Sequence, residues 1–205
     1  SKIETVGNPV RNAISGVAEP SVRYDVNDSS PLKLLVVGGS LGAQVLNETL
    51  PKALALLDRP FEVRHQCGRD NETATQAAYD SEALSAHQFT VQPFIDDMAA
   101  AYNWADIVVC RAGALTVTEI QNVGIAAIFV PLPSAVDDHQ TANARTLTEH
   151  QAGILLPQNE LTPNKLSNEL NMLDRRACLE MAEKGHALAN RQACQRVADI
   201  IWQAL

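Results

Sequence analysis

The chain has 205 residues, of which 46% are apolar and only 4% aromatic, and its 16 basic and 24 acidic residues give a net charge of −8. This composition supports a folded domain with an aliphatic core and excludes a generally basic nucleic-acid binder. The longest apolar runs are too short to span a bilayer, and the polar first residues do not form a signal peptide. The four cysteines lack the spacing of a zinc knuckle or a disulfide framework, so we expect small core residues in a reducing compartment.

Six short runs rich in β-branched and other apolar residues alternate with helical patterns from residue 32 onward. We expect strands at 32–37, 61–66, 89–92, 106–110, 126–131 and 153–156. We expect helices between them at 46–57, 72–84, 98–104, 115–123 and 140–150. Several runs are apolar throughout, as strands buried on both faces of a parallel sheet require, and helices supply the crossovers between such strands. The sequence therefore predicts an α/β fold with a Rossmann-like, doubly wound parallel sheet.

The two ends of the chain differ from this alternating region. Residues 1–31 show little periodicity and indicate an interdomain linker that leads into the domain. Because the chain lacks an initiator methionine, we expect it to be part of a longer protein. Thr162 and Pro163 are typical of a helix start, and the spacing beyond them predicts a set of C-terminal helices. The expected divisions are a linker at 1–31, an α/β core at 32–160 and C-terminal helices at 161–205.

A glycine-rich turn follows the first predicted strand and leads into a helix. It contains Gly38, Gly39, Ser40 and Gly42. At a helix start the backbone N–H groups lack internal partners and the helix dipole adds partial positive charge, so glycines there let a phosphate approach the backbone. A tight turn without a ligand is the alternative. The spacing matches neither the dinucleotide fingerprint G-x-G-x-x-G nor a Walker A loop.

A second turn of this kind contains Gly113, between the fourth predicted strand and the helix that follows it. In an open parallel sheet both helix starts lie at the carboxyl edge, where they can face one diphosphate from two sides. Glu119 lies on the second helix, and its side chain tilts back toward the helix start, where a carboxylate can accept both hydroxyl hydrogens of a ribose. The alternative is a surface carboxylate that stabilises the helix dipole.

The third candidate segment leaves the fifth predicted strand and enters a helix. Gln140 and Asn143 share a face of that helix and His139 stands at its start, and these neutral groups suit a ligand rich in hydroxyls, such as a sugar. The alternative is that Asp137 and Asp138 cap the helix and His139 lies on the surface. A metal site formed by these three adjacent residues is not expected.

Two arginines can balance phosphate charge in this acidic chain, Arg11 and Arg111, although a solvent-exposed salt bridge is the expected role of Arg111. His65 and the other histidines outside the third segment are expected to be structural or surface residues. No Ser/His/Asp or Cys/His set has the spacing of a nucleophilic catalytic site.

Five segments together resemble the MurG family, the bacterial glycosyltransferases that add N-acetylglucosamine to the lipid-linked muramoyl-pentapeptide precursor of peptidoglycan. The segments are 7–11 (GNPVR), 38–43 (GGSLGA), 93–98 (PFIDDM), 110–119 (CRAGALTVTE) and 138–143 (DHQTAN). Five ordered motifs across nearly the whole chain are more specific than any single glycine turn. Members of that family are two-domain GT-B enzymes. The resemblance covers only the carboxyl-terminal half, which holds the donor UDP-N-acetylglucosamine.

The resemblance implies a role for each segment. The backbone at Ile95 would read the uracil edge, although nothing in its local chemistry singles it out, and Glu119 would bind the ribose hydroxyls. The diphosphate would lie against the glycine turn and the second helix start, formed by Gly38, Gly39, Ser40, Gly42, Ala114, Leu115 and Thr116. The sugar would be contacted by His139, Gln140 and Asn143. Arg11 would sit at the domain junction near the phosphates.

The resemblance also implies what this half does not contain. The family is inverting and needs no cofactor or bound metal, so helix dipoles would stabilise the departing UDP. The lipid-acceptor pocket, the membrane-binding patch and the general base belong to the amino-terminal half, so no catalytic residue is expected in this chain. We therefore expect a chain that binds the donor but does not transfer the sugar alone. The whole protein would lie peripherally at the cytoplasmic face of the bacterial inner membrane.

Three other functions remain open. A sugar-nucleotide epimerase half would share the fold and the donor. A partner-dependent, non-catalytic donor-binding module would have the same site without a covalently linked second half. A nicotinamide-dependent oxidoreductase is disfavoured because the glycine fingerprint is not met.

Overall fold

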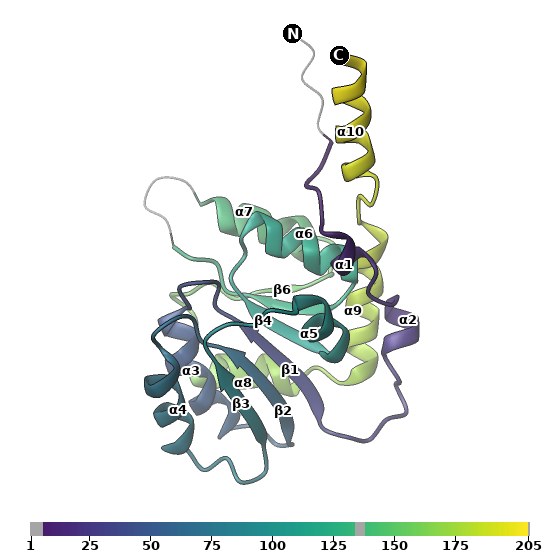
Figure 1. Ribbon diagram of the computed structural model, residues 1–205. Coiled ribbons are helices and arrows are strands. Elements are labelled where there is room, and N and C mark those ends of the chain that lie inside the picture. The colour runs from purple at the N-terminus through teal and green to yellow at the C-terminus, as the bar shows by residue number, and fades with distance from the viewer. Residues whose placement is uncertain (1–5, 134–137, 205) are drawn as a thin grey trace.

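The computed structural model describes residues 6–133 and 138–204, the side chains of 203–204 excepted. Six parallel strands form one sheet in the order β3-β2-β1-β4-β5-β6 (Figure 1). The strands are β1 (Leu32–Val37), β2 (Phe61–Gln66), β3 (Gln88–Gln92), β4 (Ile107–Cys110), β5 (Ala126–Phe129) and β6 (Ile154–Leu155). Each strand lies where the sequence predicts it. The expected fifth strand runs two residues too far, because the apolar run continues past the last paired residue of β5.

Two short helices precede β1, and longer ones connect the strands or follow the last strand. They are α1 (Asn12–Ser15), α2 (Pro20–Arg23), α3 (Gln44–Leu54), α4 (Glu72–Asp80), α5 (Met98–Trp104), α6 (Ala114–Val123), α7 (His139–Thr148), α8 (Pro163–Asn171), α9 (Arg175–Ala187) and α10 (Ala193–Ala204). The five helices expected between strands are present. α4 ends before its predicted limit. The prediction runs too far because Leu84, which lies in the loop after the helix, is also buried, so the apolar spacing continues beyond α4.

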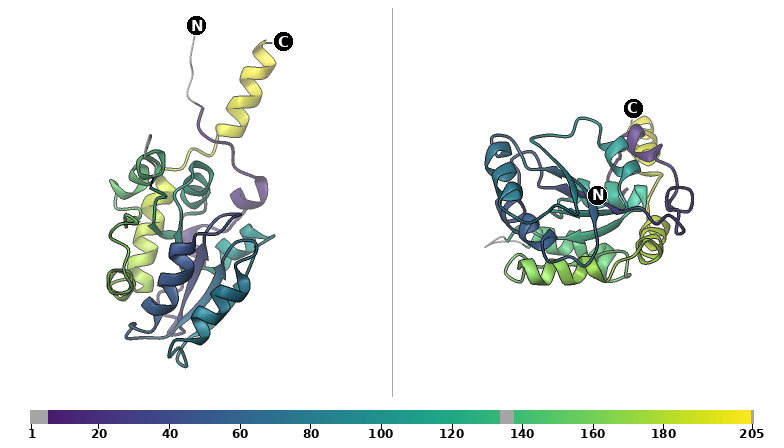
Figure 2. Two further views of the ribbon diagram at one scale, coloured as in Figure 1. Left: turned by 90° about the vertical axis from the view of Figure 1, so that its left-hand side faces the viewer. Right: turned by 90° about the horizontal axis from the view of Figure 1, so that it is seen from below.

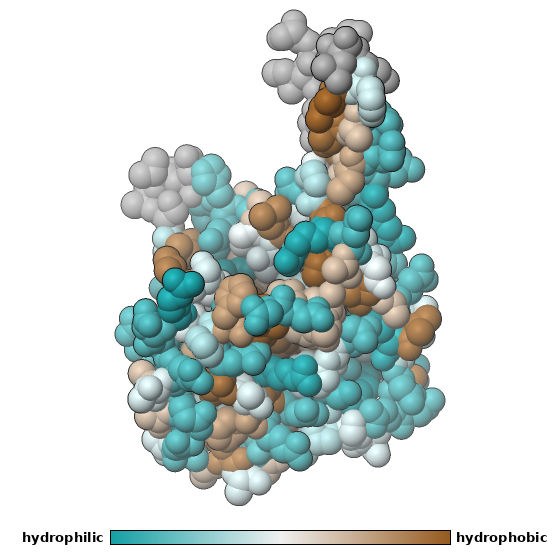
Figure 3. All heavy atoms as spheres, viewed as in Figure 1, coloured by the Kyte–Doolittle hydropathy of each residue, from teal (hydrophilic) through white to brown (hydrophobic). Residues whose placement is uncertain are grey.

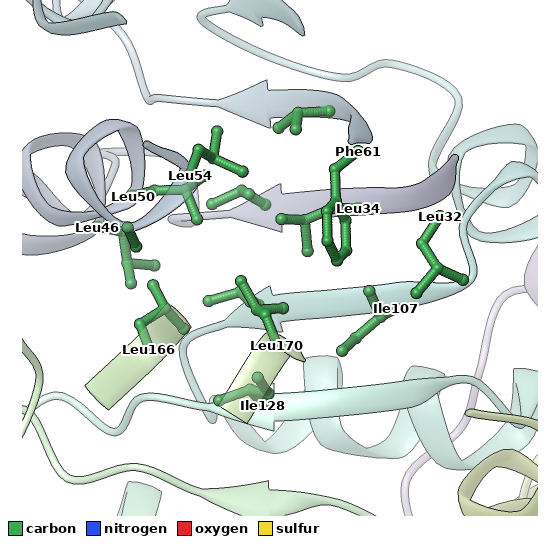
Figure 4. Close-up of a cluster of buried hydrophobic side chains, with 14 of the residues drawn as sticks. Leu32, Leu34, Leu46, Leu50, Leu54, Phe61, Ile107, Ile128, Leu166 and Leu170 are labelled. Carbon is green, nitrogen blue, oxygen red and sulfur yellow. The ribbon is translucent and has the colours of Figure 1, made fainter. Parts of the chain in front are cut away.

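The helices cover both faces of the sheet, as the views in Figure 2 show. One layer contains α3, α4, α8 and α9, whose apolar side chains pack with Leu34, Ile107 and Ile128 of the strands. In Figure 4, Leu166 and Leu170 of α8 lie opposite these strand residues. The other layer contains α1, α5, α6 and α7, which pack against the alternate residues of the same strands. The doubly wound α/β fold predicted from the sequence is therefore confirmed.

Residues 12–24, expected to be part of a linker, form two short helices that pack on the domain. Ile14 and Tyr24 are buried. The Tyr24 hydroxyl donates to the carbonyl of Asp106 at 2.6 Å and accepts from the amide of Ala126 at 3.2 Å, so it joins the amino ends of β4 and β5. Helices of four residues are too short to show an apolar period, so the sequence does not reveal them. The domain boundaries stay a prediction, but this segment is more than a connector.

Three helices follow β6, as the sequence predicts. Thr162 caps α8 by accepting a hydrogen bond from the amide of Lys165 at 3.1 Å. α10 stands away from the rest of the domain beside the amino-terminal segment (Figures 1 and 2), where the Sγ of Cys194 lies 3.5 Å from the carbonyl of Val10. Cys194 is exposed, whereas the other three cysteines are buried, which corrects the expectation that all four lie in the core.

Apolar side chains lie on the surface of α10 (Figure 3). Ile200 and Ile201 of this helix are 39% and 56% exposed. Within the described part of the chain, no helix combines the length and the hydropathy needed to cross a membrane.

Candidate functional site at the carboxyl edge of the sheet

The chain changes direction within the sheet between β1 and β4. It moves outward from β1 through β2 and β3, then returns to β4 on the other side of β1. β1 and β4 end side by side, with Val37 paired to Cys110, and the amide of Arg111 donates to the carbonyl of Val37 at 3.4 Å. Both glycine turns follow these residues directly. In doubly wound sheets such a switch point opens a crevice at the carboxyl edge where ligands bind.

Positive backbone angles shape the first turn. Gly39 and Gly42 have φ values of +86° and +77°, which residues with a Cβ rarely adopt. A Cβ on Gly42 would lie 1.9 Å from the carbonyl oxygen of Cys67, so this glycine lets the turn pack against the loop after β2. A Cβ on Gly39 would meet nothing within 4 Å. Gly38 is buried, whereas Gly39 and Ser40 are exposed, so the turn presents open backbone and a hydroxyl at the surface.

The second turn places three free donors at the start of α6. Gly113 is the N-cap residue, and the amide of Val117 donates to its carbonyl at 3.0 Å. In the described ranges, no acceptor contacts the preceding amides of Ala114, Leu115 and Thr116. Free amides at a helix start, together with the helix dipole, form a ready anion-binding site. The structure thus provides the donors that the predicted diphosphate site needs.

Glu119 lies one turn further along α6 and is held from two sides. Its side chain is 16% exposed. Oε1 accepts a hydrogen bond from the Arg11 guanidinium at 3.1 Å, and Oε2 accepts one from the Tyr102 hydroxyl at 3.2 Å. Burial, and then the nearby charge of Glu119, raises the pKa of Tyr102 well above its usual value, so the phenol remains a donor. Glu119 is therefore not the freely solvated surface carboxylate of the alternative interpretation.

Two amide side chains of α7 hold the edge together. Gln140 Oε1 accepts from the amides of Ala112 and Leu132 at 3.1 and 3.0 Å, and so joins the loops after β4 and β5. Asn143 Nδ2 donates to the carbonyl of Ala112 at 3.1 Å. Gln140 and Asn143, two of the three predicted sugar-contacting residues, thus have a structural role. No residue that the structure describes forms a hydrogen bond with Nε2 of Gln140 or Oδ1 of Asn143.

The other polar residues of the third segment lie at the start of α7. Exposed His139 opens the helix, as expected, whereas Asp138 occupies the N-cap position without a side-chain hydrogen bond to the helix, so it does not cap it. Asp137 lies outside the described residues. Arg111 donates to two consecutive backbone carbonyls after β5, at 3.1 and 3.2 Å, and forms no ion pair with any residue that the structure describes. Among the described side chains, no group of three or more His, Cys, Asp and Glu could hold a metal ion.

Ile95, which only the resemblance singles out, combines a buried side chain with an unpaired backbone. Its side chain is 8% exposed and belongs to the same apolar cluster as Tyr102. Its amide N–H and carbonyl form no hydrogen bond with any residue that the structure describes. A free donor and acceptor on one residue can pair with the edge of a base.

A buried polar network that the sequence does not reveal supports the first turn. His65 of β2 is fully buried, with Nδ1 3.0 Å from the hydroxyl of Tyr79 and Nε2 3.0 Å from Oδ1 of Asn47. The Nδ2 of Asn47 donates at 3.0 Å to the carbonyl of Cys67, against which Gly42 packs. Burial lowers the pKa of His65 from 6.5 to about 3, so the imidazole is neutral.

A cavity of ≈ 310 Å³ opens beside the second turn. Ala114 and Asn143 line it together with Asn8, Thr118 and Asn190. Another cavity, of ≈ 320 Å³, lies at the opposite edge of the sheet, near the start of β1. Of these two cavities, only the first adjoins predicted site residues.

The strand order and the two turns at the switch point define a doubly wound α/β domain whose carboxyl edge can bind an anion. The chain belongs to the glycosyltransferase family 28 C-terminal domain family, which matches residues 33–201.

Curated relatives match the whole chain. Proteins from Psychrobacter arcticus and Psychrobacter cryohalolentis are 86% and 84% identical over 205 residues. Both are named UDP-N-acetylglucosamine–N-acetylmuramyl-(pentapeptide) pyrophosphoryl-undecaprenol N-acetylglucosamine transferase. The match covers 100% of this chain but 57% of each relative, so the chain spans little more than half their length.

Solved structures agree on the fold. The crystal structure of MurG from Acinetobacter baumannii matches with a TM-score of 0.87 at 45% sequence identity, over 93% of this chain and 55% of that chain. The glycosyltransferase VinC, in complex with dTDP, matches with a TM-score of 0.56 at 19% identity, over 91% of this chain and 45% of that chain, which supports the fold alone. The domain is thus one half of the GT-B architecture.

Proposed function

We propose that this chain is the donor-binding half of an inverting glycosyltransferase of peptidoglycan synthesis. The whole enzyme would transfer N-acetylglucosamine from UDP-N-acetylglucosamine to lipid-linked muramoyl-pentapeptide, which converts lipid I to lipid II. The observation that carries the proposal is the juxtaposition of turn 38–43, the free amides at the start of α6 and the carboxylate of Glu119 at one switch point. The two Psychrobacter relatives, which bear the name of this activity, support the choice of donor.

The site has a group for each part of such a donor. The diphosphate would lie between the exposed glycine of the first turn and the amides that begin α6, where the charge on UDP grows as the sugar leaves. The backbone of Ile95 would pair with the uracil edge, and Glu119 would accept the ribose hydroxyls. The Nε2 group of Gln140 and the Oδ1 atom of Asn143, together with His139, would contact the sugar. Arg11 adds positive charge beside the Glu119 carboxylate.

The amides at the start of α6 would stabilise the departing UDP without a metal ion or another cofactor, because they are already aimed and partly positive. The acceptor lipid, the general base and the membrane contact would belong to the part of the enzyme that this chain does not include. The complete protein would lie peripherally at the cytoplasmic face of the inner membrane, with no nucleic-acid partner.

Isothermal titration calorimetry of this chain tests the donor site. UDP and UDP-N-acetylglucosamine should bind, whereas ADP should bind at least about tenfold more weakly, the difference expected when one base-edge hydrogen-bond pattern is lost. Absence of UDP binding would contradict the proposal. Binding of NADH as tight as that of UDP would point instead to an oxidoreductase.

Proton NMR of UDP-N-acetylglucosamine incubated with the chain tests the reaction class. The donor should remain unchanged, and no sugar should reach a lipid acceptor. Formation of an epimeric sugar nucleotide would indicate an epimerase half. Transfer to the acceptor by this chain alone would show that the general base lies within it.

A further inference from the structure

We infer that Tyr102 is a positioning residue for ribose recognition: its buried hydroxyl orients the Glu119 carboxylate so that both oxygens face the ribose diol of the nucleotide. This inference rests on the proposed function, because it concerns the same nucleotide. The geometry that carries it is the hydrogen bond from the Tyr102 hydroxyl to Glu119 Oε2 at 3.2 Å. The two residues come from different helices, α5 and α6, so the bond fixes one helix relative to the other.

The hydroxyl and the carboxylate depend on each other. Tyr102 is 1% exposed, so water cannot replace a lost partner, and a buried hydroxyl without an acceptor is costly. Among the described residues, Glu119 is the acceptor that the hydroxyl contacts. The terminal torsion of a glutamate is otherwise broad, so without this donor the carboxylate can turn.

The remaining capacity of the carboxylate matches a ribose. Each carboxylate oxygen can accept about two hydrogen bonds. Among the residues that the structure describes, Arg11 donates to Oε1 and Tyr102 donates to Oε2, and these two donors leave one acceptor position on each oxygen. The two neighbouring hydroxyls of a ribose supply two donors at matching separation, whereas a 2′-deoxyribose supplies one.

Arg11 is a weaker candidate for orienting the carboxylate. Its side chain is 64% exposed, compared with the buried ring of Tyr102. Exposed ion pairs contribute little because water and salt compete with them. Its long side chain also has several rotatable bonds, whereas the ring is fixed by the apolar cluster around it.

α5 connects this positioning contact to base recognition. Asp97 caps the helix by accepting from the amide of Ala100 at 2.9 Å, and the free backbone of Ile95 lies two residues before this cap. Tyr102 lies near the other end of the same helix, and its ring shares a cluster with the Ile95 side chain. One capped helix therefore holds the proposed uracil-pairing backbone at its start and the phenol that orients the ribose-binding carboxylate near its end.

Calorimetric titration of the full chain with UDP and with 2′-deoxyuridine 5′-diphosphate measures the effect. The wild type should bind UDP at least about tenfold more tightly than the 2′-deoxy compound, which is the range for one hydrogen bond to a charged group. Tyr102→Phe should reduce this preference to about threefold or less, because water only partly replaces the phenol at a carboxylate of low exposure. Its affinity for the deoxy compound should fall by a smaller factor than that for UDP, because only one hydroxyl of that sugar can reach the carboxylate and the diphosphate contacts are unchanged.

Tyr24→Phe is the matched control. Tyr24 is also buried and also loses a bonded hydroxyl, but at the amino edge of the sheet, so its variant should be less stable yet keep the wild-type preference. A variant with p-fluorophenylalanine at position 102 fills the space of the hydroxyl without donating, and it should match Tyr102→Phe. If Tyr102→Phe does not fold, this variant decides the test.

The outcomes separate the two proposals. A wild-type chain that does not bind UDP would contradict the proposed function. A wild type with ribose preference that Tyr102→Phe retains would overturn the present inference alone. Equal loss of affinity for both nucleotides in Tyr102→Phe would also overturn it, because that result indicates a general structural role. A wild type that binds both nucleotides equally would show that Glu119 does not read the ribose.

Discussion

Acid should destabilise this domain through His65. The orientation of Asn47 fixes the tautomer of the neutral ring: its Nδ2 donates to the carbonyl of Cys67, so its Oδ1 faces Nε2 of His65, which must hold the hydrogen. Nδ1 then accepts from the hydroxyl of Tyr79. A proton on Nδ1 would displace that donor and place a charge in the core. Burial accordingly lowers the pKa of His65 to about 3.

The sign and size of the effect follow from this pKa. In the unfolded chain His65 has its ordinary pKa of 6.5, so it binds a proton at a pH at which His65 of the folded chain remains neutral. Below pH 6.5 the unfolded state therefore binds more protons, and the free energy of unfolding falls as the pH falls toward 3. Between pH 7 and pH 5 the titration of His65 should lower the free energy of unfolding by about 2 kcal/mol. Typical domains have a stability of about 5–15 kcal/mol, so the loss is measurable.

Urea unfolding of the wild type and of His65→Gln at pH 7, 6 and 5 provides the test. The variant should be less stable at pH 7, because glutamine replaces the buried hydrogen bonds imperfectly, but it cannot titrate. The stability gap should therefore narrow by about 2 kcal/mol at pH 5. His87 and His186, whose pKa values burial also lowers, titrate in both proteins and cancel in the difference. A gap that is equal at pH 7 and pH 5 would refute the reasoning.

Four further substitutions test the carboxyl edge. Glu119→Ala should weaken UDP binding by about 1–3 kcal/mol in calorimetry, and an unchanged affinity would exclude a ribose contact. Gly39→Val should lose UDP affinity, because its side chain would stand on the open side of the turn where the phosphate approaches; since a φ of +86° strains any residue with a Cβ, circular dichroism must show that the variant is folded. Gly42→Ala should instead lower the melting temperature, since its Cβ would meet the Cys67 carbonyl at 1.9 Å. Full UDP affinity in folded Gly39→Val would show that the diphosphate does not bind at this turn. Gln140→Ala should lower the free energy of unfolding by about 1–3 kcal/mol, because two loop amides lose their acceptor, and wild-type stability in urea would contradict that role.

The sheet was predictable because its central strands are buried on both faces. β4 and β5 are buried at every position, so their sequences are apolar without alternation, which is the pattern of central parallel strands. The order of elements then placed both glycine turns at one edge, without knowledge of any contact. α1 and α2 were not predictable, because they are held by distant partners: Arg23 donates to the carbonyls of Tyr102 and Val123 across the fold.

The partners within the site were less predictable than its residues. Gln140 lies on the predicted helix face, but its Oε1 is engaged because the loops after β4 and β5 converge on it, which depends on the tertiary structure. Arg11 and Glu119 are 108 positions apart in the chain. Tyr102 and Glu119 are closer in sequence, yet a buried aromatic residue on a short helix resembles any core position. The signal that could have indicated it is the hydroxyl, because a buried tyrosine needs a partner.

The proposed nucleotide site rests on two separate buried supports, each built on a tyrosine hydroxyl. On the β2 side, Tyr79 and His65 hold the asparagine that fixes the carbonyl behind Gly42, and so the shape of the first turn. On the β4 side, Tyr102 holds Glu119. The first support should affect the binding of every ligand with a diphosphate. The second should affect the binding of ligands whose ribose hydroxyls contact Glu119. Substitution of His65 should therefore lower the affinities for UDP and 2′-deoxyuridine diphosphate by the same factor, whereas substitution of Tyr102 should change the ratio of these two affinities.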